Sequence, residues 1–211
     1  VIKHYRESGA HRILVIAPAA LKQQWYDDLG KHFGLDSNDF TVISMQNISE
    51  QERLIDEMRK PWVREVDLFV IDEAHNLRSP SSARYETILS LLDTSPDAPV
   101  LLLTATPINN SLMDFANQIQ LGLRGSMVSV PVQYRNKDDV IQSIDFIDAL
   151  RLIQAEAKKA EKAGEVFDWS RYDSTLRSGL RHYLVRSTRQ GVEAEGSLQK
   201  GGVQQHFPRT T

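Results

Sequence analysis

Three short, unbroken apolar segments constrain the fold of this chain more than any other feature of its sequence. They cover residues 13–17, 68–71 and 100–103, are rich in branched side chains, and stop abruptly at polar residues or proline. Strands that are buried on both faces of a parallel sheet have this composition. A weaker strand is predicted at residues 40–44. The sequence therefore predicts a mostly parallel sheet.

Segments with helical spacing lie between these strands. Apolar residues recur at every fourth position over residues 21–33, and at intervals of three and four over residues 85–92. Ser49 and Glu52 have the spacing of a capping box, which predicts the start of a further helix. Because strands and helices alternate, we predict an α/β domain over residues 1–123.

The second half of the chain has a different pattern. Residues 124–134 carry a glycine and a proline, which predicts a loop. Apolar residues at helical spacing over residues 140–153 lead into a segment rich in alanine, lysine and glutamate, and together they predict a long helix with one solvated face. Leucines at every fourth position predict another helix around residues 176–184. We therefore expect a helical insertion or extension over residues 124–190 and a linker over residues 191–211.

Composition excludes several classes of protein. The chain has a formal net charge of −3 and no cysteine, which excludes a disulfide framework, a thiolate zinc site and a uniformly basic nucleic-acid-binding protein. The apolar segments are far shorter than the ~18 residues of a membrane span. The lack of cysteine fits a reducing compartment. We expect the cytoplasm of a bacterium or archaeon, or the nucleus of a eukaryote.

Polar residues follow the predicted strands, at the edge where ligands bind in open parallel sheets. Asp72 stands at the tip of the second long strand, where it can hold Mg²⁺, usually through a water molecule. Glu73 can orient or deprotonate an attacking water. His75 can hydrogen-bond to the hydroxyls of Thr104 and Thr106 at the next strand tip. A surface turn is the alternative interpretation of the tetrapeptide Asp-Glu-Ala-His, but its position after a buried strand favours a site.

Several segments resemble motifs of superfamily-two helicases. Residues 70–75, Val-Ile-Asp-Glu-Ala-His, look like motif II, and residues 103–107, Leu-Thr-Ala-Thr-Pro, look like motif III. Residues 14–18, followed by a helix that reaches Trp25, resemble motif Ia of the Swi/Snf branch. Residues 106–110, Thr-Pro-Ile-Asn-Asn, are similar to the threonine-proline-isoleucine-glutamine-asparagine signature of that branch. Weaker similarities follow at residues 183–189, which resemble a Leu-Arg-Arg-Thr segment, and at 42–46, where motif Ic would fall.

This resemblance has clear implications for fold and activity. It implies the RecA-like first lobe of a DNA-stimulated ATPase, a three-layer α/β domain, with ATP and Mg²⁺ as cofactors. Proteins of the Swi/Snf branch translocate along duplex DNA and remodel protein–DNA complexes. Backbone amides and short polar side chains suit contact with DNA phosphates without sequence readout. The candidate DNA-contacting residues are Lys22, Gln24, Ser44, Gln46, Arg78 and Asn109.

Two of these residue assignments have competing interpretations. Lys22 is equally well interpreted as an ordinary exposed helix lysine. Trp25 is interpreted as a core residue at helical spacing rather than as a platform for base stacking.

The sequence lacks a phosphate loop of the form G-x-x-x-x-G-K-[ST]. The pair Gly30-Lys31 falls within a predicted helix and does not form one. The resemblance places the loop one helix upstream of motif Ia, so we expect it immediately before Val1. It also implies a second RecA-like lobe, which would supply an arginine finger and would follow Thr211. We therefore expect the 211-residue chain alone to be inactive.

Two alternatives remain open at this point. One is a DEAH-type helicase that separates RNA or DNA strands, which Thr-Ala-Thr-Pro alone would allow. The other is a module that binds DNA or protein and never hydrolyses ATP. Residues upstream of Val1 distinguish the second alternative, because it predicts that they also lack a phosphate loop.

Overall fold

A central sheet of four parallel strands organises the first half of the chain. The computed structural model describes residues 2–36, 38–60, 65–105, 111–126, 128–136, 138–184, 199–200 and 203–204. The sheet has the order β2-β1-β3-β4. Its strands are β1 (Ile13–Ala17), β2 (Phe40–Ser44), β3 (Leu68–Ile71) and β4 (Val100–Leu102). The predicted parallel sheet is therefore confirmed.

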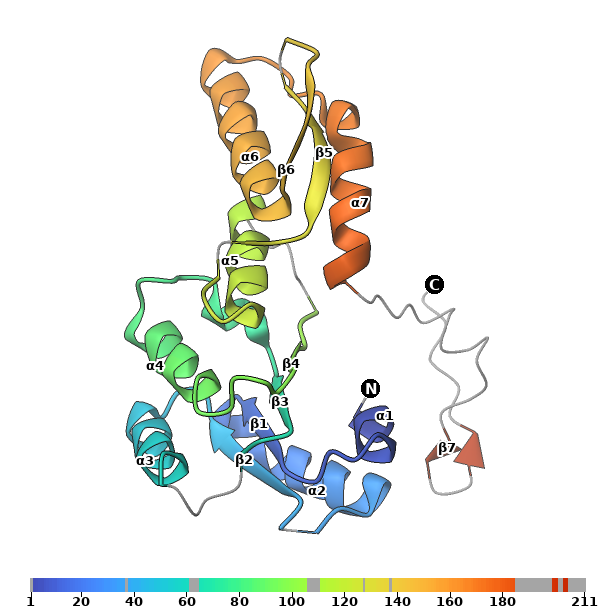
Figure 1. Cartoon of the computed structure of the whole chain (residues 1–211). Coiled ribbons are helices and arrows are strands. Elements are labelled where there is room, and N and C mark those ends of the chain that lie inside the picture. Colours follow the sequence, from blue (N-terminus) through green and yellow to red (C-terminus); the bar gives the residue numbers. More distant parts are fainter. Residues whose placement is uncertain are drawn as a thin grey trace.

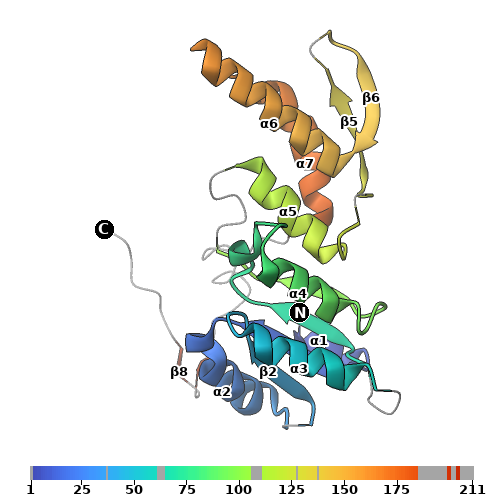
Figure 2. The same ribbon diagram turned by 90° about the vertical axis from the view of Figure 1, so that its left-hand side faces the viewer.

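Helices cover both faces of this sheet and complete a three-layer α/β lobe (Figures 1 and 2). Successive side chains of a strand point to opposite faces, so Val15 and Val70 pack on one side while Ile16 and Ile71 pack on the other. The helices on the first side are α1 (Ile2–Glu7) and α2 (Lys22–Phe33). Those on the second side are α3 (Ile48–Met58) and α4 (Ala83–Leu92).

The register of the strands brings their carboxyl ends to one edge of the sheet. Ala17 is paired with Ser44, and Ile71 lies between Ile16 and Leu102. The polar residues that follow the strands must therefore meet at this edge, as the sequence predicts. Short 3₁₀ turns begin two of these connections, η1 (Ala19–Leu21) and η2 (Ala74–Leu77).

The start of α3 differs from the predicted capping box. The cap is Asn47, whose side-chain oxygen accepts a hydrogen bond from the backbone N–H of Glu50 at 3.0 Å. Ser49 already lies inside the helix. Asn is as good a cap as Ser, and its side chain satisfies one of the N–H groups that the first turn of the helix leaves free.

A second apolar core lies beyond the sheet, around α5 (Leu112–Gly122) and the elements that follow it (Figure 1). The hairpin β5 (Pro131–Arg135) and β6 (Ile141–Asp145) is antiparallel. It is followed by α6 (Phe146–Ala163), the turn η3 (Trp169–Tyr172) and α7 (Asp173–Tyr183). Two short strands, β7 (Gln199–Lys200) and β8 (Val203–Gln204), pair near the end of the chain.

The hairpin corrects the expectation of a purely helical extension. The predicted loop over residues 124–134 runs into β5, and the predicted helix begins at Phe146 instead of residue 140. Val132 and Tyr134 are buried between exposed neighbours, which is the period of two that a strand requires. Ile141 is 56% exposed, so its apolar character does not mark a buried helix face.

Helices α6 and α7 approach each other closely at one glycine. A Cβ atom at Gly179 would lie 2.1 Å from the Cδ2 atom of Phe146, whose ring is fully buried. The Phe146 ring also stacks on Tyr183 at a centroid distance of 6.1 Å. Only a residue without a side chain therefore fits at position 179 without displacing this ring.

A half-buried glutamate, Glu156, connects two tyrosines of the same core. The hydroxyls of Tyr134 and Tyr172 donate hydrogen bonds to the Glu156 carboxylate at 2.7 Å and 2.5 Å. Burial and this carboxylate raise the pKa of Tyr172 to about 12.

Among the described residues, no helix is long and apolar enough to cross a membrane.

Candidate active site

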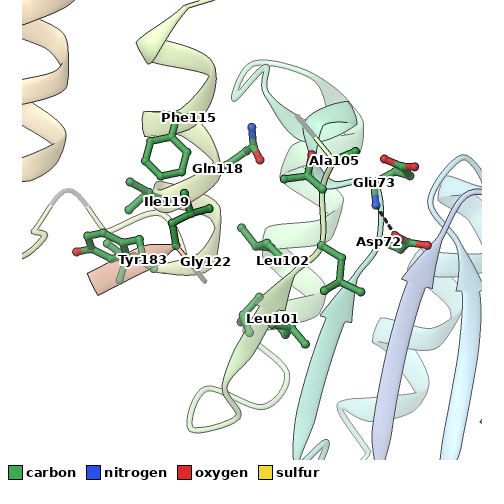
Figure 3. Close-up of a pocket in the computed structure, with 15 residues that line it drawn as sticks. Asp72, Glu73, Leu101, Leu102, Ala105, Phe115, Gln118, Ile119, Gly122 and Tyr183 are labelled. Atoms are coloured by element: carbon green, nitrogen blue, oxygen red, sulfur yellow. Dashed lines mark hydrogen bonds between the residues drawn. The ribbon is translucent and has the colours of Figure 1, made fainter. Parts of the chain in front are cut away.

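The acidic pair Asp72-Glu73 follows directly after β3, at the carboxyl edge of the sheet (Figure 3). The Asp72 N–H donates to the carbonyl oxygen of Ile16 at 2.8 Å and so continues the pairing with β1. One carboxylate oxygen, Oδ1, accepts the N–H of Glu73 at 2.9 Å. The other, Oδ2, accepts the indole N–H of Trp25 at 2.8 Å. Both oxygens are thus held in place, and each keeps lone-pair capacity for a further contact.

Glu73 adopts a backbone conformation that side-chain-bearing residues rarely take. Its φ and ψ angles are 50° and 45°, in the left-handed region. This conformation costs about 1–2 kcal/mol for a residue other than glycine, and such strain concentrates at functional sites. The turn lets the next amide return to the sheet, where the Ala74 N–H donates to the Leu103 carbonyl at 2.9 Å.

His75 joins the acidic pair to the neighbouring strand end. Its Nδ1 atom lies 3.1 Å from Oε2 of Glu73 and 3.3 Å from Oγ1 of Thr104, which follows β4. This ring nitrogen therefore lies between the carboxylate of Glu73 and the hydroxyl of Thr104. The structure therefore brings together four of the predicted site residues, while Thr106 and Asn109 lie outside the described residues.

The donor set at this edge fits Mg²⁺ better than a metal held by protein alone. Over the described part of the chain, no group of three or more His, Cys, Asp or Glu residues is arranged so that it could hold a metal ion by itself. Mg²⁺ is usually held by one or two carboxylates, by substrate phosphates and by several waters. Asp72 offers the carboxylate that such an arrangement needs.

An apolar cavity of about 600 Å³ lies beside the acidic pair, between β4, α5 and the end of α7 (Figure 3). Asp72, Glu73 and Gln118 contribute polar groups to its lining. The rest of the wall is mostly apolar and includes Leu101, Leu102, Phe115, Ile119 and Tyr183. This cavity follows the outer side of β4, which pairs with β3 but with no other strand of the described residues. Its apolar lining does not suit phosphate groups.

A second polar cluster forms where β1 and β2 end. The Lys22 ammonium contacts Oε1 of Glu50 at 2.8 Å. The other oxygen of Glu50 accepts the N–H of Ser44 at 2.9 Å. Gln46 is exposed, and its side-chain oxygen accepts the N–H of Ala19 at 2.9 Å. Three candidate DNA-contacting residues are therefore neighbours.

The other two described candidates lie apart from this cluster. Gln24 is exposed on α2, while Arg78 follows η2 and is half-buried. The Arg78 carbonyl accepts a hydrogen bond from Nδ2 of Asn117 on α5 at 2.7 Å. The backbone of Arg78 thus has a structural contact with the extension.

Sequence reasoning missed Glu50 and the polar contact of Trp25. Burial alone would raise the pKa of Glu50, but the hydrogen bonds from Lys22 and Ser44 outweigh it, and the net pKa is lowered from 4.5. The sequence signal for Glu50 was only an acid in the first turn of a helix. For Trp25, helical spacing correctly indicated a partly buried side chain but could not show where its N–H points.

Replacing Glu50 by glutamine should destabilise the chain by about 1–2 kcal/mol at neutral pH, because a charge-assisted network is lost. A lowered carboxyl pKa stabilises the fold above the unfolded value of 4.5, and this contribution is lost as the pH falls through the folded pKa. The difference between wild type and Glu50→Gln should therefore shrink below pH 4.5. Chemical denaturation at pH 7 and pH 4 measures the free energy of unfolding of both proteins. Glu52→Gln, at an exposed position of α3, is the control, and a difference that does not depend on pH contradicts this role for Glu50.

The layered lobe, with an acidic pair at the carboxyl edge of its parallel sheet, is the arrangement of a RecA-like domain. The sequence model of the DEAD/DEAH box helicase family matches residues 1–115, which is more than half of the chain. The chain therefore belongs to the DEAD/DEAH box helicase family.

Several curated relatives are similar to this chain. An uncharacterized ATP-dependent helicase, YqhH, of Bacillus subtilis is 28% identical over 71% of the chain and 28% of its own length. Elongation factor 4 of Wolinella succinogenes is 27% identical over 64% of the chain and 24% of its own length. RNA polymerase-associated protein RapA of Stutzerimonas stutzeri is 32% identical over 46% of the chain and 12% of its own length. The chain thus spans less than a third of each of these proteins.

A solved structure shows the same fold. The SWI2/SNF2 ATPase core of Sulfolobus solfataricus, in complex with double-stranded DNA, matches with a TM-score of 0.53 and 17% identity over 90% of this chain and 36% of that one. The predicted resemblance is confirmed: the family is that of the DEAD/DEAH box helicases, and the fold is that of a Swi/Snf-type ATPase lobe.

Proposed function

We propose that this chain is the first ATPase lobe of a Swi/Snf-type translocase that uses ATP to move along duplex DNA and remodel protein–DNA complexes. The observation that carries the proposal is the contact between Glu73, His75 and Thr104 beside Asp72. It links an acidic pair suited to nucleotide hydrolysis to the end of the neighbouring strand.

Each residue of this group has a distinct role in the proposal. Asp72 would hold Mg²⁺, and Glu73 would orient or deprotonate the attacking water. His75 contacts the Glu73 side chain and connects it to Thr104 at the end of the neighbouring strand. When bound, Mg²⁺ neutralises charge on the nucleotide phosphates.

Hydrolysis in this proposal belongs to the intact protein. The 211 residues contain no phosphate loop, and the chain spans 28% of the length of its Bacillus subtilis relative. We expect the phosphate loop and a second lobe elsewhere in the intact protein. We also expect the 211-residue chain alone to be inactive.

Duplex DNA is the partner that this proposal assigns. The polar cluster of Lys22, Ser44 and Gln46 lies at the same sheet edge as the acidic pair. The SWI2/SNF2 core with the same fold is described in complex with double-stranded DNA. Contacts to phosphates would give binding without sequence preference. Gln24, Arg78 and Asn109 remain candidates for further contacts.

The intact protein should hydrolyse ATP faster with blunt duplex DNA than without it, and should not separate the strands. Steady-state ATPase assays and a strand-displacement assay on the same duplex measure the two activities. Efficient strand separation would support the alternative of a DEAH-type helicase. Binding of DNA without any ATP hydrolysis would support the alternative of a non-hydrolysing module.

A further inference from the structure

Trp25 makes a polar contact that its expected role as a core residue does not require. It lies near the start of α2 and packs against the apolar cluster on that side of the sheet. Its indole N–H points at the end of β3 and donates to Oδ2 of Asp72 at 2.8 Å. An indole has a single donor and no acceptor, so this contact exists only while Asp72 presents that oxygen.

The hydrogen bond limits how the Asp72 carboxylate can rotate. The terminal torsion of an aspartate is broad when nothing restrains it. Here the Glu73 N–H holds Oδ1 and the Trp25 N–H holds Oδ2, so two donors from different elements fix the plane of the group. Outer contacts of this kind orient metal-binding carboxylates and affect metal affinity.

We propose that Trp25 is a positioning residue that orients the Asp72 carboxylate for Mg²⁺ and connects it to α2. Lys22 stands three residues before Trp25, so the two share one face of the helix. Lys22 also belongs to the polar cluster proposed to contact DNA. A displacement of the start of α2 would therefore move the indole of Trp25 and change the orientation of the Asp72 carboxylate. This inference rests on the proposed function of the acidic pair.

The test compares the affinity of the intact protein for Mn²⁺, as a probe for Mg²⁺, with and without the indole N–H. Free Mn²⁺ is measured by electron paramagnetic resonance in the presence of ATP. Trp25→Phe removes the donor, and benzothienylalanine at the same position keeps the ring size while replacing the N–H by sulfur. Both changes should weaken Mn²⁺ binding by about 10-fold. Nucleotide binding without metal should stay the same.

Trp169→Phe provides the matched control, because Trp169 is half-exposed on η3, in the extension beyond the sheet. Unchanged Mn²⁺ affinity in the benzothienylalanine protein would overturn the positioning role, since that change preserves packing. Asp72→Ala separates this result from a failure of the proposed function. If Asp72→Ala also leaves Mn²⁺ affinity unchanged, the acidic pair does not hold the metal and the proposed function itself is wrong.

Discussion

Replacing Glu73 by glutamine should lower the rate of ATP hydrolysis by the intact protein by about 10²–10⁴-fold, with nucleotide binding retained. The amide has nearly the same shape as the carboxylate, and its oxygen can keep the contact with His75. It cannot take up a proton from an attacking water, so the loss falls on the chemical step. Steady-state hydrolysis at saturating duplex DNA measures the rate, and a fluorescent ATP analogue measures binding.

A matched substitution shows whether this effect is local. Glu57 is exposed on α3, away from the sheet edge, and Glu57→Gln should leave hydrolysis unchanged. If Glu73→Gln retains wild-type turnover, the role given to Glu73 is wrong, and the water must be activated elsewhere. If Glu73→Gln also loses nucleotide binding, the residue acts in binding instead of in the chemical step.

Replacing Gly179 by alanine should destabilise the chain by about 2–3 kcal/mol, although alanine favours helices. The added Cβ would lie 2.1 Å from a ring atom of Phe146. That ring is fully buried and stacked on Tyr183, so it cannot move aside without disturbing the core of the extension. A fall of roughly 4–12 °C in the midpoint of thermal unfolding would correspond to this loss.

Gly30→Ala provides the control for this prediction, because Gly30 also lies in a helix but its added Cβ would meet no atom closer than 3.8 Å. It should stabilise the chain by about 0.5–1 kcal/mol through helix propensity. Combining Gly179→Ala with Phe146→Leu should cost less than the sum of the two single changes, since the smaller side chain makes room. Strict additivity would show that the two residues do not clash.

The core of the lobe could be predicted because its signals are local. Strands buried on both faces leave continuous apolar segments, and β1 and β3 are almost completely buried. The end of such a strand is visible as an abrupt change to polar residues, so the position of Asp72 followed from the sequence. Parallel pairing then brought Thr104 to the same edge, which the contact with His75 confirms.

The missed features depend on neighbours that are distant in the sequence. The strand pattern at residues 131–135 is too short to stand out beside a glycine and a proline. The partners of Trp25 and Glu50 follow from how α2 and α3 approach the strand ends, with Asp72 47 positions from Trp25 and Lys22 28 from Glu50. Neither spacing nor composition encodes such contacts.

The left-handed backbone at Glu73 has a cost for folding, while the proposed hydrolysis requires a carboxylate at this position. Glycine or asparagine would adopt the angles of 50° and 45° more easily than glutamate does. Selection for folding alone would therefore favour glycine or asparagine at position 73, whereas the proposed role of Glu73 in hydrolysis would favour the acid. A related lobe that does not carry out the proposed hydrolysis could therefore acquire glycine at position 73, and this change would stabilise its fold.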